Sequence, residues 1–505
     1  MREDIYVCRI LADVIVFLNN NTADIMSDMN NKLPDFLACA KPNPKSGRAS
    51  WDKNIAPSYA GVMLWFTFWL GLTQCCSAGA GSVFSHGYML PILALALAAL
   101  TCFVFYYVVL GEVGRKTGLP LYIVGTSTFG AKGGFLLPGL LMGLLQFGWV
   151  AVNIYFSTKA IMGFFPEPSP VLEKGVMIGW GVVAAILGLG GIAKVGKVVG
   201  KFHWIPIITL LVMACLSVPH IGKFDPQAMV ELNKVINPAV GAPLAGSAIV
   251  FAIAAYVIGF FATAGAAGVD FGANARDKRD VCMGGIVGIF GSMVFAGGLA
   301  ILIVAGAYGK YSTPETIEVL RSTAFNPTGF IDNAMDLVKI LLGENLGRWV
   351  LLLLAIAAFP SACFSSLIAA NSIKTVLPKI PPFISVGVGA AIAILLALFG
   401  YAANLGGVFG VIGASFGPIC GAMAVDYFTS GKRWSGPRAG FNPPGWMAWG
   451  LGFIVGILPN FGCPLPAAPF WAMLVGAVVY YLGAKFGLEN KVIPYGPTDS
   501  QIKDE

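Results

Sequence analysis

The sequence GLTQCCSAGAG occupies residues 71–81 and the sequence GFFATAGAAG occupies residues 259–268, and each lies inside a long apolar run. Glycine in a helix interior is about 1 kcal/mol less favourable than alanine, so both stretches weaken a helix. A helix that opens inside a membrane exposes backbone carbonyls and half-helix ends, which can bind a solute or a cation. The two stretches therefore predict two interrupted helices at mid-membrane depth.

The composition places the chain in a membrane. Hydrophobic residues make up 57% of its 505 residues and charged residues 11%, whereas globular domains carry about 25% charged residues. A spanning helix needs about 20 apolar residues, so the chain can form on the order of a dozen. This composition excludes a soluble enzyme, a nucleic-acid-binding protein and a disordered scaffold. The ten cysteines and three histidines show no metal-ligand spacing, so we expect neither a metal centre nor a cofactor.

Twelve apolar segments follow a polar N-terminal stretch, residues 1–56, and precede a polar C-terminal stretch, residues 488–505. The segments cover residues 57–83, 88–113, 134–164, 171–193, 200–219, 243–271, 282–308, 348–373, 381–400, 404–428, 444–460 and 467–487. Each is long and apolar enough to predict a helix. The sequence therefore predicts an all-α polytopic membrane protein with about 12 transmembrane helices.

Lysine and arginine are concentrated in the loops that follow even-numbered segments. The long odd loops, 220–242 and 309–347, mix both signs of charge. The basic residues of the even loops are Arg115, Lys116, Lys132, Lys194, Lys197, Arg276, Lys278, Arg279, Lys374, Lys379, Lys432, Arg433 and Arg438. Basic loops stay on the cytoplasmic side, so we expect both termini in the cytoplasm and the chain in a bacterial inner membrane or a plasma membrane.

The two glycine-rich stretches lie in the first and sixth segments, the first helix of each of two five-helix halves. Interrupted helices at corresponding places in two halves are typical of transporters built from inverted repeats. We therefore expect a ten-helix core over 57–428, with repeats at 57–219 and 243–428, and two peripheral helices within 429–487. The halves share no residue-level similarity, so hydropathy and glycine position alone carry this prediction.

Polar and aromatic side chains mark a candidate binding site on three segments. Gln146, Trp149 and Asn153 are spaced to share one helix face. An amide presents a donor and an acceptor side by side, as the edge of a heterocycle does, and an indole offers a stacking surface. Interhelical hydrogen bonding is the alternative role for these amides.

Two further pairs of residues join this candidate site. Phe260 and Phe261 lie in the second glycine-rich stretch, where an aromatic ring could close over a flat ligand. Ser361 and Ser365 share a face after Pro360, which has no backbone N–H to donate. Ordinary packing for the phenylalanines and bonding of the serines to their own helix are the alternatives.

Few ionisable side chains lie in or near the apolar segments. Glu112, Asp270 and Asp426 fall near predicted cytoplasmic helix ends with arginine or lysine close by in sequence. Structural anchoring or gating is therefore favoured over proton relay for these three carboxylates. Lys159 is expected to extend toward the membrane surface.

One stretch, Gly413-Ala414-Ser415-Phe416-Gly417, matches the GxSxG pattern of serine hydrolases. In those enzymes the serine sits on a strand-to-helix turn, whereas this stretch lies inside an apolar helix. An intramembrane serine hydrolase is therefore only a remote alternative.

Several stretches resemble the nucleobase:cation symporter-1 family, which includes purine-cytosine permeases and transporters of hydantoins, allantoin and vitamins. The resemblance runs from about residue 54 to residue 428. Its motifs are GRKTGL at 114–119 with STFGAKG at 127–133, QFGW at 146–149, GFFAT at 259–263 with Asp270-Phe271, and Gly421 through Asp426-Tyr427.

The resemblance implies a LeuT-like core of 5+5 inverted-repeat helices and uptake of a small planar nitrogen heterocycle by alternating access. In that reading Gln146 bonds the ligand edge and Phe261 stacks on it. Ser361 and Ser365 replace polar residues of the eighth helix, and Gln74 to Ala78 form the unwound part of the first. The expected partners are this solute and the lipid bilayer, with no nucleic acid, and the chain is expected to be monomeric.

The coupling ion is left open between sodium and a proton. The candidate cation positions are Cys75, Ser77, Ala78 and Ile356. The eighth segment has Phe359 and Pro360 where sodium-coupled members carry hydroxyl side chains, and neither offers a side-chain oxygen to a hard cation. A transporter of the same fold for another solute, such as an amino acid or a vitamin, is the alternative function.

Overall fold

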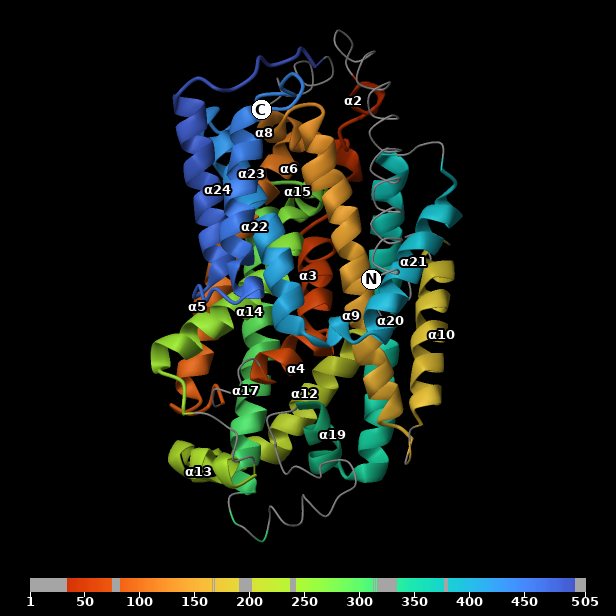
Figure 1. Cartoon of the computed structure of the whole chain (residues 1–505), viewed down its shortest axis with the longest axis vertical. Coiled ribbons are helices and arrows are strands. Elements are labelled where there is room, and N and C mark those ends of the chain that lie inside the picture. Colours follow the sequence, from red (N-terminus) through yellow and green to blue (C-terminus); the bar gives the residue numbers. More distant parts are fainter. Residues whose placement is uncertain are drawn as a thin grey trace, which may run out of the picture.

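Helices occupy part or all of each predicted apolar segment in the computed structural model (Figure 1). The structure describes residues 34–74, 82–165, 167, 169–189, 202–236, 242–311, 313, 315, 334–376 and 380–495. The five segments of the first half contain, in order, α3 (Ile55–Met63) with α4 (Phe66–Gln74); α5 (Met89–Thr101), η2 (Cys102–Val108) and α6 (Val109–Thr117); η3 (Phe135–Leu140) with α9 (Leu141–Met162); α10 (Pro170–Leu189); and α12 (Trp204–Ser217) with η4 (Val218–Lys223). The five segments of the second half contain α14 (Gly246–Ala266) with α15 (Gly268–Gly272); α16 (Lys278–Gly285), η5 (Ile286–Gly291) and α17 (Ser292–Lys310); α20 (Glu344–Val376); α21 (Pro382–Leu398); and α22 (Leu405–Thr429). The two last segments are α23 (Pro443–Ile457) and α24 (Ala468–Lys485).

Short helices connect or flank these segments. They are α2 (Asp35–Ala38), η1 (Lys45–Gly47), α7 (Leu121–Val124), α8 (Thr126–Phe129), α13 (Pro226–Ile236), α19 (Ala334–Leu342), η6 (Tyr401–Ala403) and η7 (Leu458–Phe461).

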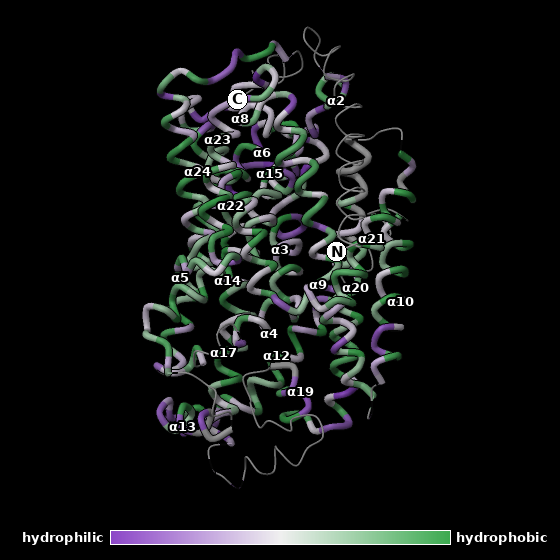
Figure 2. The backbone as a smooth tube through the Cα atoms, in the orientation of Figure 1, coloured by the Kyte–Doolittle hydropathy of each residue, from purple (hydrophilic) through white to green (hydrophobic). Residues whose placement is uncertain are grey.

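The helices are long and apolar enough to cross a membrane. Within the described residues, nine continuous helices meet this description, and α3 with α4 makes a tenth that is bent by 46°. The shorter helices α21 and α23 complete the twelve. Hydrophobic residues cover the middle of the bundle and polar residues gather at its two ends (Figure 2). The chain is an integral membrane protein.

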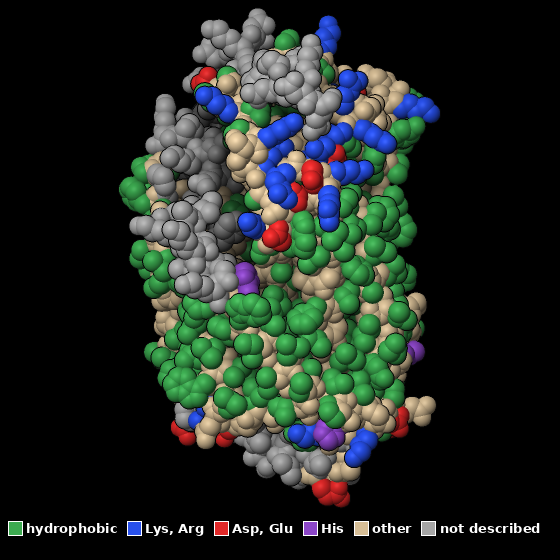
Figure 3. Space-filling model, turned by 180° about the vertical axis from the view of Figure 1, so that it is seen from behind, with side chains coloured by type: hydrophobic (Ala, Val, Ile, Leu, Met, Phe, Trp, Pro, Cys, Tyr) green, Lys and Arg blue, Asp and Glu red, His purple; other side chains and the backbone are tan. Residues whose placement is uncertain are grey.

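Basic side chains gather at one end of the bundle, beyond a broad hydrophobic band (Figure 3). Three of the predicted basic loops meet there. Lys116 Nζ donates to the Lys432 carbonyl over 3.0 Å, which joins the loop after α6 to the loop after α22. The loop after α15 meets the N-terminal segment at the same end, where Asn43 Nδ2 donates to Asn274 Oδ1 over 2.7 Å. These loops share one side, as their charge predicted.

Helix packing repeats between the two halves. The first helix of one half packs on the second helix of the other, because α3 contacts η5 and α14 contacts α5. The third helix of each half packs on the fourth of the other, through α9 with α21 and α20 with α10. The second helix of each half also contains a turn of π-helix, η2 in one and η5 in the other. Each contact made by a helix of the first half thus has a counterpart made by the corresponding helix of the second half. This correspondence supports the 5+5 repeat.

The two predicted interruptions have different outcomes. The first helix bends between α3 and α4, at Leu64 and Trp65, while residues 71–74 are helical and residues 75–81 lie outside the described residues. In the sixth helix, α14 continues through Gly259 and ends at Ala266. A Cβ at Gly259 would lie 2.6 Å from the Phe409 carbonyl oxygen. The glycines at this level allow α14 to approach α22 closely, and the helix is interrupted only at Ala267, near the end of the predicted stretch 259–268.

Helices α23 and α24 pack tightly on α22 through small residues. A Cβ at Gly413 would lie 2.6 Å from the Pro469 side chain, and a Cβ at Gly421 would lie 2.2 Å from the Met473 carbonyl oxygen. Ser415 lies between these glycines, and its hydroxyl donates to the Val411 carbonyl of the same helix over 2.7 Å. The GxSxG pattern is therefore part of a helix-packing face, which disfavours a hydrolase.

The polar segment before α3 packs on the basic end of the bundle. Arg48 Nη1 donates to the Arg115 carbonyl over 2.7 Å. The Trp51 N–H donates to Asp280 Oδ1 over 3.0 Å. Residues 34–54 of the predicted N-terminal tail are thus folded against the loops after α6 and α15.

Residues 488–495 cross the same end and join several elements. The Ala439 N–H donates to the Lys491 carbonyl over 2.9 Å, and the Ile493 N–H donates to the Pro437 carbonyl over 2.7 Å. The Tyr495 hydroxyl donates to the Ala40 carbonyl over 3.0 Å. We call residues 488–495 the C-terminal strap, because it connects the loop after α22 with the segment before α3.

Candidate functional site

A cavity of about 450 Å³ lies between the two halves, within the usual size range of small-molecule sites. Its walls come from α3 and the bend before α4, from α7, η3, α9, α14, α15 and α20. It is lined by Val62, Trp65, Pro120, Leu121, Tyr122, Phe135, Pro138, Gly139, Met142, Gln146, Trp149, Asn153, Phe260, Thr263, Ala264, Ala267, Asp270, Phe271, Ser361, Ser365 and Ile368. The predicted α9 face, both serines and Phe260 all reach it.

Gln146 presents an uncommitted amide to the cavity. Its side chain is 8% exposed. The only hydrogen bond that it makes within the described part of the chain is a long one, from Nε2 to Met142 Sδ over 3.6 Å. A thioether is a weak acceptor, and the Gln146 carbonyl oxygen has no donor among the described residues. Both amide functions are therefore available to a ligand.

Asn153 lies on the same helix face but is fully occupied by protein partners. Its Nδ2 donates to the Ala358 carbonyl over 2.9 Å and to Ser361 Oγ over 3.1 Å. Its Oδ1 accepts from Trp180 Nε1 over 3.0 Å and from Ser157 Oγ over 3.3 Å. Asn153 therefore connects α9 to α20 and α10, the alternative role that the sequence left open for these amides.

Three aromatic rings form one wall of the cavity. The Trp149 ring lies 5.1 Å from Phe260 in an edge-to-face arrangement and 5.8 Å from Trp65. Trp149 Nε1 donates to Thr263 Oγ1 over 3.2 Å, which fixes the orientation of the indole. Phe260 is supported from behind by Phe409, with ring centroids 5.3 Å apart. A flat ligand would meet rigid rings here.

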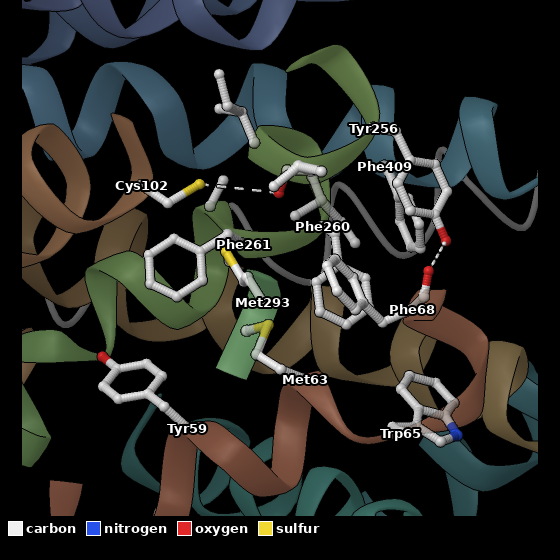
Figure 4. Close-up of a cluster of buried hydrophobic side chains, with 14 of the residues drawn as sticks. Tyr59, Met63, Trp65, Phe68, Cys102, Tyr256, Phe260, Phe261, Met293 and Phe409 are labelled. Atoms are coloured by element: carbon white, nitrogen blue, oxygen red, sulfur yellow. Dashed lines mark hydrogen bonds between the residues drawn. The ribbon is translucent and has the colours of Figure 1, made fainter. Parts of the chain in front are cut away.

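Phe261 does not line the cavity, so its predicted stacking role is not supported. Successive helix residues point about 100° apart, and Figure 4 shows Phe261 directed away from Phe260, toward the side of Tyr59. Its ring is fully buried and lies 5.7 Å from that of Tyr59. The aromatic contribution of α14 comes from Phe260 instead.

The α20 wall carries the two predicted serines. Ser361 Oγ donates to the Ala358 carbonyl over 2.6 Å and accepts from Asn153. Ser365 lines the cavity, and its hydroxyl makes no hydrogen bond with any described residue. The helix is continuous through Pro360. Ser365 is therefore the freer of the two hydroxyls.

Of the remaining binding and cation positions, those that the structure describes do not line the cavity. Gln74 is the last residue of α4 and is absent from the cavity lining. Ile356 is 37% exposed on α20, so its side chain points away from the core. Cys75, Ser77 and Ala78 lie outside the described residues. The cation site stays a prediction.

Two of the three predicted charges are held in ion pairs at the basic end. Glu112 accepts two bonds from Arg115, of 2.8 and 2.9 Å. Asp426 is 3% exposed and accepts from Arg438 over 2.9 Å, from Ser127 over 2.6 Å and from Thr128 over 2.9 Å. The Glu112 pair lies within α6, whereas Asp426 connects the end of α22 to α8 and to the loop after α22. Ion pairing fits the structural role favoured by the sequence.

Asp270 differs from these two because it lines the cavity. Its Oδ1 accepts from the Leu121 N–H over 2.9 Å, which joins α15 to the first residue of α7. Tyr122, in the loop region between spans, is next to it. Burial raises the pKa of Tyr122, and the negative charge of Asp270 raises that pKa further. The cavity thus contains a carboxylate toward its basic end.

Sequence reasoning missed Trp65, Thr263 and Met142 as cavity residues. Trp65 lies at a bend without glycine or proline, so no local signal marked it. Its indole N–H is buried and has no hydrogen-bond partner among the described residues. Thr263 follows Phe260 by three positions and shares its helix face, which helical spacing could have indicated.

Comparisons with known proteins find permease relatives and solved transporters. No family model matches the chain. The allantoin permease of Bacillus subtilis is 23% identical over 355 residues, which are 64% of this chain and 65% of the permease. A putative allantoin permease of Escherichia coli is 23% identical over 422 residues, 75% of this chain and 79% of that protein. The cytosine permease of Escherichia coli is 28% identical over 250 residues, 47% of this chain and 52% of the permease.

The chain is a homologue of the allantoin and cytosine permeases. It spans just under two thirds of the Bacillus allantoin permease and about half of the cytosine permease. The resemblance predicted from the sequence motifs is confirmed.

Solved transporters show the same fold. The inward-facing conformation of Mhp1 matches with a TM-score of 0.61 and 15% identity over 92% of this chain and 96% of that one. Mhp1, a nucleobase-cation-symport-1 family transporter, in a closed conformation with bromovinylhydantoin bound, matches with a TM-score of 0.53 and 15% identity over 92% and 99%. A Na⁺-coupled sialic acid symporter matches with a TM-score of 0.55 and 14% identity over 89% and 95%. The LeuT-like fold is confirmed.

Proposed function

We propose that the chain is a secondary active transporter that imports a small planar nitrogen heterocycle by alternating access. The observation that carries this proposal is the cavity between the two halves, where an uncommitted amide, Gln146, lies one helical turn from the aromatic wall of Trp149 and Phe260.

This arrangement fits the chemistry of a heterocycle. A ring amide or a ring nitrogen offers a donor and an acceptor on one edge, and the Gln146 side chain can pair with both. Stacking on a rigid ring adds binding free energy without immobilising flexible side chains. Most of the lining is apolar, so it favours a small ring with one polar edge over a large polar solute.

The permease relatives support the same class of solute and favour a transporter over an enzyme. The allantoin and cytosine permeases are 23% and 28% identical to this chain over 355 and 250 residues, although the present chain spans only part of each. Solutes such as amino acids or vitamins remain the alternative cargo of this fold.

We also propose the topology that the basic loops indicate. The loops after α6, α15 and α22 meet at one end of the bundle, which would be the cytoplasmic end of a protein in an inner or plasma membrane. The cavity extends from Gln146 toward Pro120 and Asp270, near that end. This supports an inward-facing arrangement. The proposed unit is a monomer, because each chain contains a whole cavity.

Ligand-dependent stabilisation tests the proposal directly. A ligand that binds the folded state raises its stability by mass action, about 2.7 kcal/mol at 100 times its Kd. Purified protein should show a raised melting temperature with allantoin, cytosine, a hydantoin or a purine. Counterflow in proteoliposomes should then show exchange of the same compound.

Amino acids and pyrimidine vitamins belong in the same panel. Stabilisation and counterflow by one of them, with none from any heterocycle named above, would replace the proposed solute class. Neither response to any compound would refute the proposal.

A further inference from the structure

Asp270 is set apart from three other partly or fully buried carboxylates that the structure describes. Glu112 pairs with Arg115, Asp280 with Arg276, and Asp426 with Arg438. Within the described part of the chain, no lysine or arginine pairs with Asp270. Its carboxylate has one hydrogen bond, from the Leu121 N–H to Oδ1, while its own backbone carbonyl accepts from Asn274 Nδ2. An unpaired carboxylate in a membrane protein is costly, and such residues mark ion or proton pathways.

Among the described residues, the surroundings of Asp270 supply no ion-pair partner with positive charge. The elements packed against α15 are α6, α7, η2 and α14, and α3 contacts it through the rings of Tyr59 and Phe271. The facing titratable groups of α3 and α7 are the phenols Tyr59 and Tyr122, which are neutral at ordinary pH.

The facing polar and charged side chains of η2, α6 and α14 already have other hydrogen-bond or ion-pair partners. The η2 phenol, Tyr107, donates to the Val281 carbonyl. On α6, Arg115 is held in two bonds by Glu112. Lys116 lies 4.0 Å from Glu112 and donates to the Lys432 carbonyl. At its α15 end, α14 presents Thr263, which accepts from Trp149.

We propose that Asp270 is the proton-binding residue through which a proton gradient drives this transporter, an inference that rests on the proposed function. A proton from hydronium in the cavity binds Oδ2 of the carboxylate, forming an O–H bond and leaving water. Oδ1 keeps the Leu121 N–H, because the carbonyl oxygen of a protonated acid still accepts. On the other side of the membrane the O–H bond breaks and the proton returns to water.

The position of Asp270 explains how the proton and the solute would be linked. Both Asp270 and Gln146 line one cavity. A change of access that exposes the cavity to one side of the membrane therefore exposes both groups to that side. The bond between Asp270 and the Leu121 N–H also joins the two halves. Helix α15 follows the first helix of the second half, and α7 follows the second helix of the first half. Neutralising it removes a net charge from the contact between the halves.

The experiment compares exchange with accumulation in proteoliposomes, using radiolabelled allantoin and cytosine. Counterflow needs only solute binding and access changes, whereas accumulation also needs the coupled ion. For one proton per solute, a gradient of one pH unit allows up to about tenfold accumulation. The variants are Asp270→Asn and Asp270→Glu. Asp225→Asn is the matched control, because Asp225 is exposed and its carboxylate, among the described residues, accepts only the Gln227 N–H at the start of α13.

The expected result is selective. Wild type, Asp270→Glu and Asp225→Asn should accumulate solute in an inward proton gradient and lose accumulation with a protonophore. Asp270→Asn should keep counterflow but reach an internal-to-external ratio of about one.

Gradient-driven accumulation by Asp270→Asn equal to wild type would overturn the inference, and so would wild-type accumulation driven by sodium but not by protons. Loss of counterflow in Asp270→Asn alone would also overturn it, because Asp270 would then be required for binding or folding. Absence of counterflow in wild type would instead reject the proposed function itself.

Discussion

Gln146 and Asn153 present the same chemical group on one face of α9, yet the structure gives them opposite roles. In Gln146→Ala, a ligand that is paired with the amide would keep a buried donor or acceptor without a partner. That costs about 1–3 kcal/mol, which corresponds to an increase in Kd of roughly fivefold to 150-fold. The ligand-free protein loses only the long bond to Met142, so its melting temperature should change little.

Asn153→Ala serves as the contrasting variant. It removes four hydrogen bonds of 2.9–3.3 Å and leaves Trp180 Nε1 without an acceptor. Side-chain hydrogen bonds in membrane proteins contribute about 0.6 kcal/mol each on average, so the loss of stability should be about 2 kcal/mol. The ligand-free melting temperature of Asn153→Ala should therefore fall clearly below that of wild type.

The assay is a thermal melt of each purified variant across a series of ligand concentrations, which reports stability without ligand and the Kd together. Gln146→Ala should lose the ligand response at unchanged starting stability, and Asn153→Ala should lose starting stability. If Gln146→Ala lowers the ligand-free melting temperature as much as Asn153→Ala while keeping the same Kd, then Gln146 only holds helices together.

Four further variants test the site and its support. Phe260→Ala should raise the Kd several-fold, whereas Phe261→Ala should lower thermal stability by about 3 kcal/mol or more without a specific effect on Kd; equal Kd values for the two would contradict the placement of the cavity. Asp426→Asn should lower the free energy of unfolding by about 3–5 kcal/mol, because the buried positive charge of Arg438 loses the negative charge of Asp426. An unchanged melting temperature would show that the ion pair is dispensable. Gly421→Leu should prevent correct packing of α24 on α22 and reduce the folded yield in detergent, and a normal yield would contradict that close contact.

The positions of the helices were predictable from hydropathy, but the bend in the first helix was not. A run of about 20 apolar residues identifies a span whatever its partners are. Glycine, by contrast, both weakens a helix and permits close packing, and only the neighbouring helix decides between these effects. At Gly259 the backbone of Phe409 fills the space of a side chain, so the helix stays intact. The bend at Trp65 arises without glycine or proline, where no sequence signal exists.

Half of the site could be predicted for a similar reason. Helical spacing placed Gln146, Trp149 and Asn153 on one face, and all three line the cavity. Spacing along one helix could not tell which amide is already bonded, because the partners of Asn153 come from α20 and α10. Nor could it choose between adjacent residues such as Phe260 and Phe261, which face different neighbours.

The C-terminal strap has a consequence for the order of assembly during synthesis. Arg438 pairs with Asp426 over 2.9 Å and with Glu489 over 2.8 Å. The ribosome makes Glu489 only after α24. In a nascent chain that has inserted α22 but not yet α24, Arg438 can therefore pair with Asp426 alone. Helix α8, which contains Ser127 and Thr128 and is translated far earlier, completes its surroundings only at that late stage. Stop codons or fusions between α24 and Tyr495 should therefore disturb the region where α8, between the second and third spans, meets the end of the tenth span, as well as the tail itself.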